Sequence, residues 1–354
     1  MIGRNRSSLE MARARAVQEA ERRHRRLNTD LSKRIDIFDI IERDNLWLMF
    51  QPLGNLYGSY LPIDGSAGIL INANHPLNLQ RYTASHEYGH FVLGHEVSLD
   101  EAESIQPHRS EHNLQEAAAQ SYAAYFLMPM QLVNTVLRSM GLPLKPENLM
   151  PAEAYHFSLE LGASYAAVVN HLATLNKISW EVANELRGQE PKIIKAEIGL
   201  GTRPQDVHAD VRALDEHDSG RIFHIRVNDE LHILLPEAPS TGYIWTVDKT
   251  TIVDLRGDAS AEDESANGAF LALVDEKFQP AAHPGELRLG AGGLRHFVFR
   301  SLKPGKHTLQ LVNRRPWQAN TRGLKTFEVF LDISSNNIQG LRERQQESLL
   351  LVGA

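Results

Sequence analysis

The chain contains no cysteine, and this absence excludes three kinds of chemistry. It can form no disulfide, it has no cysteine nucleophile, and it cannot build a zinc site from thiolates. Any metal ion must therefore be held by histidine, aspartate or glutamate side chains.

Long hydrophobic runs are also lacking, since no stretch approaches the roughly eighteen apolar residues of a membrane span. The N-terminus shows no charged segment followed by an apolar one, so we expect no secretory signal and a cytoplasmic protein. The net charge of −7 and the pI near 6.1 argue against nucleic acid as a partner of the whole chain. A length of 354 residues favours two domains.

One segment departs from this acidic balance. Residues 1–35 hold ten Lys and Arg against four Asp and Glu, including the basic run at residues 22–26. We interpret the segment as a basic helical arm exposed to solvent, with a DNA contact as the alternative.

The remaining chain divides into two halves of different pattern. Residues 36–188 read as helices with one small β-rich patch, and residues 221–335 alternate with a period of two, which predicts an antiparallel β-sandwich of immunoglobulin size. We expect a linker at residues 189–220 and a tail at residues 336–354. The fold class is therefore α+β.

The clearest expected helices cover 79–95, 113–128 and 164–175, and the expected strands include 46–50, 58–61, 68–72, 223–227, 231–235, 297–299, 308–311 and 326–331.

The stretch SHEYGHF, residues 85–91, places His86 and His90 four positions apart. On a helix this spacing puts both imidazoles on one face, where they can bind one ion. Glu87 follows the first histidine and can reach a water on that ion. A catalytic zinc site needs three protein ligands and one open position, so a third ligand is required.

A longer metalloprotease motif would supply a third histidine, but Leu93 and Glu96 occupy its glycine and histidine positions. The alternative is a glutamate on the following helix. We select Glu116, because it begins the apolar-periodic segment, over Glu101, Glu103 and Glu111.

Two stretches, RYTASHEYGHFVLGH and EAAAQSYAAYFLMP, closely resemble the ImmA/IrrE family of zinc metallopeptidases. The family has an HELGH helix followed by a helix that carries a glutamate and ends in Met-Pro. The resemblance runs from near Leu46 to residue 172. It implies a zincin-like domain that binds Zn²⁺ through His86, His90 and Glu116, with Glu87 as the general base.

Some positions depart from the family pattern. Gln120 replaces an Asn or Asp and Tyr122 replaces a Phe, so any hydrogen bond from the shorter side chain to a ligand is in doubt. Gln120, Tyr88 and His95 are candidates for orienting a ligand or assisting the reaction, with packing as the alternative for Tyr88 and His95.

The second half contains three loop motifs: LPEAPSTGYIW at residues 235–245, LGAGGLRHFVF at 289–299 and RRPWQ at 314–318. Together they resemble the loops of the chagasin-like inhibitors of papain-type cysteine proteases. The resemblance covers about residues 227–333 and implies a partner-binding end of an immunoglobulin-like sandwich. Ala238 replaces the Asn, and Ser240 the first Thr, of the family's NPTTG loop. Loss of the Asn side-chain amide weakens the case for inhibition of cysteine proteases. Trp245 is expected in the core. The candidate contact residues are Pro239, Ser240, Thr241, Gly242, Tyr243, Gly292, Gly293, Arg315, Pro316 and Trp317.

Together these resemblances imply a zinc endopeptidase that acts by limited proteolysis on a regulatory protein, such as a helix-turn-helix repressor supplied in trans. The setting would be a stress, mobile-element or toxin–antitoxin-like response, with the β-sandwich as a partner-binding or regulatory module. The alternative is a protease inhibitor or interaction protein with a non-catalytic metal site. Structural zinc normally has four protein ligands, and only three are assigned, which favours the enzyme.

Overall fold

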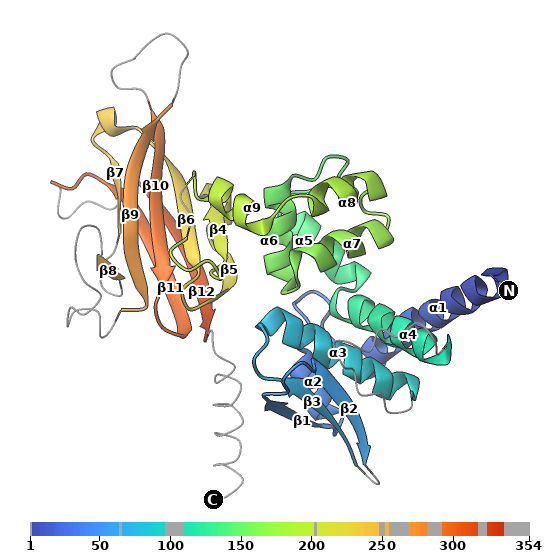
Figure 1. Ribbon diagram of the computed structural model, residues 1–354. Coiled ribbons are helices and arrows are strands. Elements are labelled where there is room, and N and C mark those ends of the chain that lie inside the picture. Colours follow the sequence, from blue (N-terminus) through green and yellow to red (C-terminus); the bar gives the residue numbers. More distant parts are fainter. Residues whose placement is uncertain are drawn as a thin grey trace, which may run out of the picture. The chain divides into compact units, whose positions relative to one another are not determined.

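The computed structural model describes residues 2–63, 66–95, 110–201, 204–247, 252–254, 269–281, 292–317 and 324–335. The chain forms two compact units that divide between Gln189 and Glu190. The first unit is mainly helical with a small sheet and the second is β-rich (Figure 1), which confirms the α+β class. Glu101, Glu103 and the tail 336–354 lie outside the described residues.

In the first unit, two helices precede a small sheet. They are α1 (Ile2–Leu27) and α2 (Ile37–Arg43), and the strands are β1 (Trp47–Gln51), β2 (Gly58–Ile63) and β3 (Ser66–Asn72). Strand β3 lies in the middle, parallel to β1 and antiparallel to β2. The other helices are α3 (Leu77–Leu93), α4 (Ser110–Leu127), α5 (Met130–Ser139), α6 (Pro151–Leu161), α7 (Tyr165–Thr174) and α8 (Trp180–Arg187).

Two amide side chains tie the end of β3 to the loop between β1 and β2 and to the start of α3. Asn72 donates through Nδ2 to the carbonyl oxygens of Gly54 and Leu56, at 3.1 and 2.6 Å. Gln80 donates through Nε2 to the carbonyl oxygen of Asn72 at 3.0 Å. Because buried backbone groups are satisfied in this way, the sheet holds α3 in a defined place.

The N-terminal helix α1 is not the solvated arm that its composition predicts. Ala16, Ala20 and His24, spaced four residues apart, are buried, and α1 packs against α4 (Figure 1). Arg23 forms an ion pair with Asp44, the residue that ends α2, and donates to the Tyr88 hydroxyl at 2.7 Å. The two small alanines allow this close packing, but the many arginines around them make the segment read as solvent-exposed in the sequence.

Two buried histidines complete the C-terminal end of α4. Nε2 of His24 lies 2.9 Å from the carbonyl oxygen of Phe126, and Nε2 of His171 lies 2.8 Å from that of Met128. Carbonyl groups at a helix end have no partner within the helix, so these imidazoles supply donors. Burial lowers the pKa of each histidine to about 4, and both are therefore neutral near pH 7.

The second unit begins earlier than expected. The segment 189–220, predicted as a linker, contains helix α9 (Pro191–Ile198), strand β4 (Val211–Leu214) and a 3₁₀ turn, Glu216–Asp218. Strand β4 pairs in parallel with β6 (Glu230–Glu237) and is thus part of the sandwich. Its four residues are too few to show a clear alternation.

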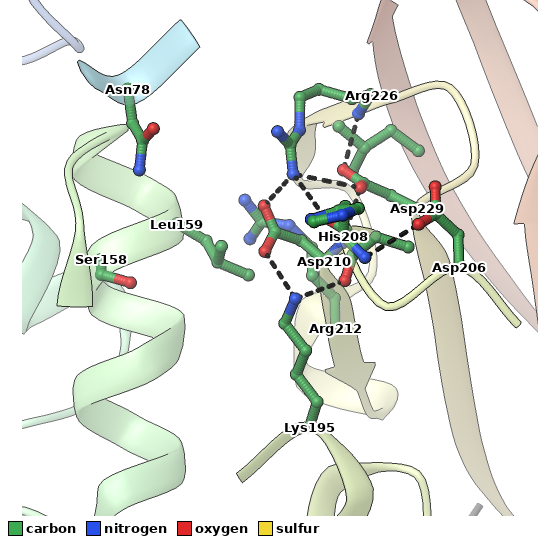
Figure 2. Close-up of polar contacts among 12 residues, drawn as sticks. Asn78, Ser158, Leu159, Lys195, Asp206, His208, Asp210, Arg212, Arg226 and Asp229 are labelled. Carbon is green, nitrogen blue, oxygen red and sulfur yellow. Dashed lines mark hydrogen bonds and ion pairs between the residues drawn. The ribbon is translucent and has the colours of Figure 1, made fainter. Parts of the chain in front are cut away.

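A charged network fastens α9 to this unit (Figure 2). The Lys195 ammonium donates to the carbonyl oxygen of Ala209 at 2.6 Å and lies 3.6 Å from Asp210, which pairs with Arg226 at 2.5 Å. Buried Asp229 accepts the backbone N–H groups of Asp210 and Arg226 at 2.8 and 2.7 Å. Burial raises the pKa of Asp229 to about 6, an effect that Arg226 opposes.

The sandwich consists of a five-stranded sheet, in the order β4-β6-β10-β9-β8, and a four-stranded sheet, in the order β5-β12-β11-β7. Among the described strands of the sandwich, three pairs are parallel, and each involves an edge strand: β4 with β6, β8 with β9, and β5 with β12. The sequence predicted an antiparallel sandwich, but alternation of period two does not encode strand direction. The strands not yet given are β5 (Ile222–Arg226), β7 (Ile244–Val247), β8 (Ile252–Asp254), β9 (Leu271–Pro280), β10 (Gly293–Ser301), β11 (Gly305–Arg314) and β12 (Lys325–Ser334).

The sandwich core lies between the two sheets and is built from the inward-facing residues of both. Trp245 belongs to this core and is only 4% exposed, as the sequence predicted. Its backbone N–H donates to Glu237 at 2.8 Å, and its indole N–H donates to the carbonyl oxygen of Pro236 at 2.9 Å. The Glu237 carboxylate also binds the Arg295 guanidinium at 2.5 Å, so a buried ion pair supports the strands beneath the loop end.

Candidate metal centre

Helices α3 and α4 bring together three residues that lie up to 30 positions apart. Nε2 of His86 is 3.2 Å from Oε2 of Glu116, and Nε2 of His90 is 3.4 Å from Oε1 of the same carboxylate. The two Nε2 atoms are 3.1 Å apart. All three donor groups thus converge on one point between the helices.

Close contact of the two helices makes this convergence possible. Gly89 lies one position before His90 on α3, and a Cβ atom there would come within 3.0 Å of the Tyr122 ring on α4. Tyr122 is fully buried and its ring stacks on Phe126 at a centroid distance of 5.2 Å. A larger residue at position 89 would therefore push α4, and Glu116 with it, away from the histidines.

The residues of the site are well shielded from water. His86, Glu87 and His90 are 7%, 2% and 2% exposed, and the Glu116 side chain is 20% exposed. Shielding strengthens electrostatic interactions, because water no longer screens them. Glu87 adjoins His86 on α3 and is also buried.

The donor set fits a divalent metal ion. Two imidazoles and a carboxylate, with ligand atoms within 4.8 Å of one another, match the donor types and number of a catalytic zinc site. Buried His and Glu side chains would otherwise be costly to gather at one point. A further protein ligand is not found among the described residues.

Of the three candidates for orienting a ligand, His95 alone is placed beside one. Its Nδ1 atom lies 3.1 Å from Nδ1 of His90. Tyr88 lies on the other side of the helix, where its hydroxyl accepts from Arg23 of α1 and donates to Asp44, at the end of α2, at 2.8 Å. Gln120 is exposed. The structure therefore assigns Tyr88 to packing between helices.

Tyr82, which is not among the site residues predicted from the sequence, belongs to the surroundings of the site. Its ring stacks near His86 at a centroid distance of 6.3 Å, one helical turn before that residue. Burial raises the pKa of Tyr82 to about 12, and the nearby Glu116 charge adds to the effect. The spacing 82, 86, 90 along one helix face was the signal that could have identified it.

At the loop end of the sandwich, two of the three predicted loops are in contact. Gly242 has φ +78°, and a Cβ there would lie 2.6 Å from the Trp317 ring, so both conformation and space require glycine. Arg315 donates to the carbonyl oxygen of Thr241 at 3.3 Å and lies over the Tyr243 ring at 4.7 Å. Trp317 is nevertheless 68% exposed.

The other loop-end candidates are placed as follows. Pro239, Ser240 and Pro316 are exposed. Gly293 pairs within β10, and a Cβ there would lie 2.2 Å from the carbonyl oxygen of Gln279, so it serves the sheet rather than a contact loop. The backbone of Gly292, just before that strand, accepts the N–H of Ala281 at 3.0 Å.

Two histidines and one glutamate on a helix pair form a candidate metal centre in the first unit, and the second unit is a β-sandwich. Residues 41–170 match the family model Peptidase_M78, the IrrE N-terminal-like domain. Residues 224–330 match the model Inhibitor_I42, the chagasin family of peptidase inhibitors. The chain therefore carries a peptidase-type domain followed by a chagasin-type domain, and both predicted resemblances are confirmed.

Curated relatives resemble the chain over about a third of its length. Chagasin of Trypanosoma cruzi is 29% identical over 113 residues, which are 32% of this chain and 89% of the relative. Amoebiasin-2 of Entamoeba histolytica is 25% identical over 119 residues, 34% of this chain and 82% of the relative.

Among solved structures, the cysteine protease inhibitor EhICP2 of Entamoeba histolytica is 24% identical, with a TM-score of 0.28, covering 36% of this chain and 97% of that protein. The inhibitor ICP of Leishmania mexicana is 25% identical with a TM-score of 0.21, covering 36% and 89%. In the described part of the chain, no helix has the length and apolarity needed to cross a membrane.

Proposed function

We propose that the first unit is a zinc-dependent endopeptidase in which His86, His90 and Glu116 bind the ion and Glu87 is the general base. The convergence of three buried donor groups from two helices supports the proposal most directly. The match of residues 41–170 to a peptidase family supports it independently. Two imidazoles with one carboxylate favour zinc over the oxygen-seeking ions calcium and magnesium.

Zinc held by His86, His90 and Glu116 would supply Lewis-acid chemistry, which makes a nearby water easier to deprotonate and a peptide carbonyl easier to attack. The Glu87 carboxylate would accept a proton from the attacking water and then donate it to the leaving amine. Its position next to His86 on α3 and its burial support this role. Glu116 and the two histidines bind and orient without exchanging protons.

The substrate would be a regulatory protein supplied in trans, such as a helix-turn-helix repressor in a stress, mobile-element or toxin–antitoxin-like response, and the chain itself would act in the cytoplasm. The second unit would bind a protein partner through the end where Trp317 covers Gly242. An exposed tryptophan held against a rigid turn is a contact of the kind that dominates interface energies.

An inhibitor or interaction protein with a non-catalytic metal site is the second candidate. It is favoured by the match of residues 224–330 to a family of peptidase inhibitors. In that case the metal centre would stabilise the first unit only.

The substitution Glu87→Gln distinguishes the peptidase from the inhibitor or interaction protein. The substitution keeps the three metal ligands, so zinc content should remain stoichiometric while hydrolysis falls by about a hundredfold or more. His86→Ala and Glu116→Ala should lose zinc, measured as metal content of the purified protein. Glu181→Gln, at an exposed position on α8, serves as the control.

Hydrolysis that survives in Glu87→Gln would contradict the peptidase assignment, and stoichiometric zinc in both ligand variants would contradict the metal site. Partner binding that persists in Glu87→Gln, with no hydrolysis by the wild type, would support the inhibitor.

A further inference from the structure

His95 is the first residue after the turn that ends α3. Gly94 adopts the left-handed conformation, with φ 68° and ψ 38°, and the chain reverses there. The N–H of His95 then donates to the carbonyl oxygen of His90 at 3.0 Å. The reversal returns the His95 side chain to the last turn of the helix, next to the metal-binding face.

The two imidazoles of this turn meet through their Nδ1 atoms. These atoms are 3.1 Å apart, within hydrogen-bonding distance, and the rings meet edge to face at a centroid distance of 5.0 Å. Nε2 of His90 faces the opposite way and lies 3.4 Å from Glu116. His90 is thus held at one nitrogen while the other is directed into the donor cluster.

A neutral imidazole carries one proton, and only the nitrogen without it can bind a metal ion. With Nε2 of His90 directed into the donor cluster, the proton must be on Nδ1. That proton then points at Nδ1 of His95, which can accept it only when the proton of His95 is on Nε2. The contact therefore selects one tautomer for each ring.

We propose that His95 is a positioning residue of the metal centre, which accepts the Nδ1 hydrogen of His90 and so holds the ring orientation and tautomer that zinc binding requires. The proposal rests on the zinc site proposed above. Histidine ligands in metal sites almost always donate their second nitrogen to a carboxylate, a carbonyl or water. Here a second histidine, placed by a glycine turn, takes that place.

The test measures zinc affinity of the full chain by competition with a chelator. His95→Phe keeps a ring but removes the acceptor, and should weaken zinc binding by about 10- to 100-fold. His95→Asn places an amide oxygen close to where Nδ1 lies, and should recover most of the loss. His75→Phe is the control, since His75 precedes α3 and its ring contacts that of Tyr57, with centroids 5.0 Å apart.

A second measurement needs no variant. Nitrogen NMR of the imidazoles in the zinc-loaded wild type should show a proton on Nδ1 of His90 and on Nε2 of His95. A proton on Nδ1 of His95 would overturn the proposal, as would wild-type affinity in His95→Phe or equal losses in the Phe and Asn variants. Failure of the wild type to bind zinc would instead overturn the metal site itself.

Discussion

The candidate metal centre of the first unit and the loop end of the second differ in how their candidate functional side chains are held. His86, Glu87 and His90 are at most 7% exposed, whereas Trp317 is 68% exposed. Buried polar groups keep their geometry because surrounding helices and hydrogen bonds leave them no alternative. An exposed tryptophan depends on a few contacts, here with Gly242 and Arg315. Stability and function should therefore be coupled at the metal centre and separable at the loop end.

Removal of the metal should have the largest effect on stability. An ion that binds only the folded state, at about a thousandfold excess over its Kd, stabilises that state by about 4 kcal/mol. Calorimetry of the wild type with zinc and with a chelator should show this difference in the transition of the first unit. His86→Ala should show no zinc-dependent shift, and equal stabilisation of that variant would show that the ion binds elsewhere.

Glu237→Ala should have the next largest effect, and only in the second unit. The Glu237 side chain is fully buried, where it binds Arg295 and the Trp245 N–H. Because the Arg295 side chain is 18% exposed, loss of this ion pair should cost about 3 kcal/mol, the lower end of the range for buried pairs. Denaturant unfolding should show this loss, while zinc content stays unchanged. Glu216→Ala, at an exposed position 3.9 Å from Lys325, is the control.

Acidification from pH 6.5 to 5.5 should separate the two units further. His24 and His171 have pKa values near 4 when folded, below the 6.5 of the unfolded chain, so the unfolded state binds more protons in this range. Stability of the first unit therefore falls as pH falls, by about 1 kcal/mol for each histidine. His171→Gln, which keeps a donor for Met128, should show a shallower dependence, and an unchanged slope would refute the assignment.

The second unit should depend less on pH in the same range, because two of its buried groups oppose each other. Burial lowers the pKa of His296 to about 4, so this histidine favours the fold as pH rises. The raised pKa of Asp229, about 6, makes that carboxyl group destabilising as pH rises from 3.8 to 6. Calorimetry should therefore show a smaller shift of the second transition than of the first, and a larger one would contradict this cancellation.

Trp317→Ala should change stability least, by less than about 0.5 kcal/mol, because the side chain is mostly exposed. If the loop end binds a papain-type protease, the same change should weaken inhibition by about thirtyfold, as expected for an interface residue worth about 2 kcal/mol. Leu324 is also mostly exposed, at 64%, and Leu324→Ala should leave inhibition unchanged. Inhibition unaffected by Trp317→Ala would place any partner site elsewhere.

Much of the first site could be predicted because its signals are local. A spacing of four on a helix places His86 and His90 on one face, and the helical pattern from residue 113 identified the element that carries Glu116. The strands at 47–51, 58–63 and 66–72 also follow from short apolar runs bounded by turn residues. The three loop motifs likewise predicted the class of the second unit, because each motif is a short stretch of sequence.

Other features could not be predicted, because they depend on contacts between distant segments. The arginine-rich composition of α1 concealed the stripe from Ala16 to His24 that packs on α4. Tyr88 lies between two candidate metal ligands in the sequence, yet its hydroxyl donates a hydrogen bond to Asp44, 44 residues away. Strand β4 is too short to be recognised before its pairing with β6 is known.

The sequence by itself determined the class of each half, the absence of thiol chemistry and the candidate ligands, since composition and helical periodicity are properties of short segments. Only the tertiary structure decided which glutamate meets the two histidines, which side chain supports His90 and where the sandwich begins. Those outcomes depend on how helices and strands far apart in the chain pack together, and burial and hydrogen bonding select among the arrangements that local patterns allow.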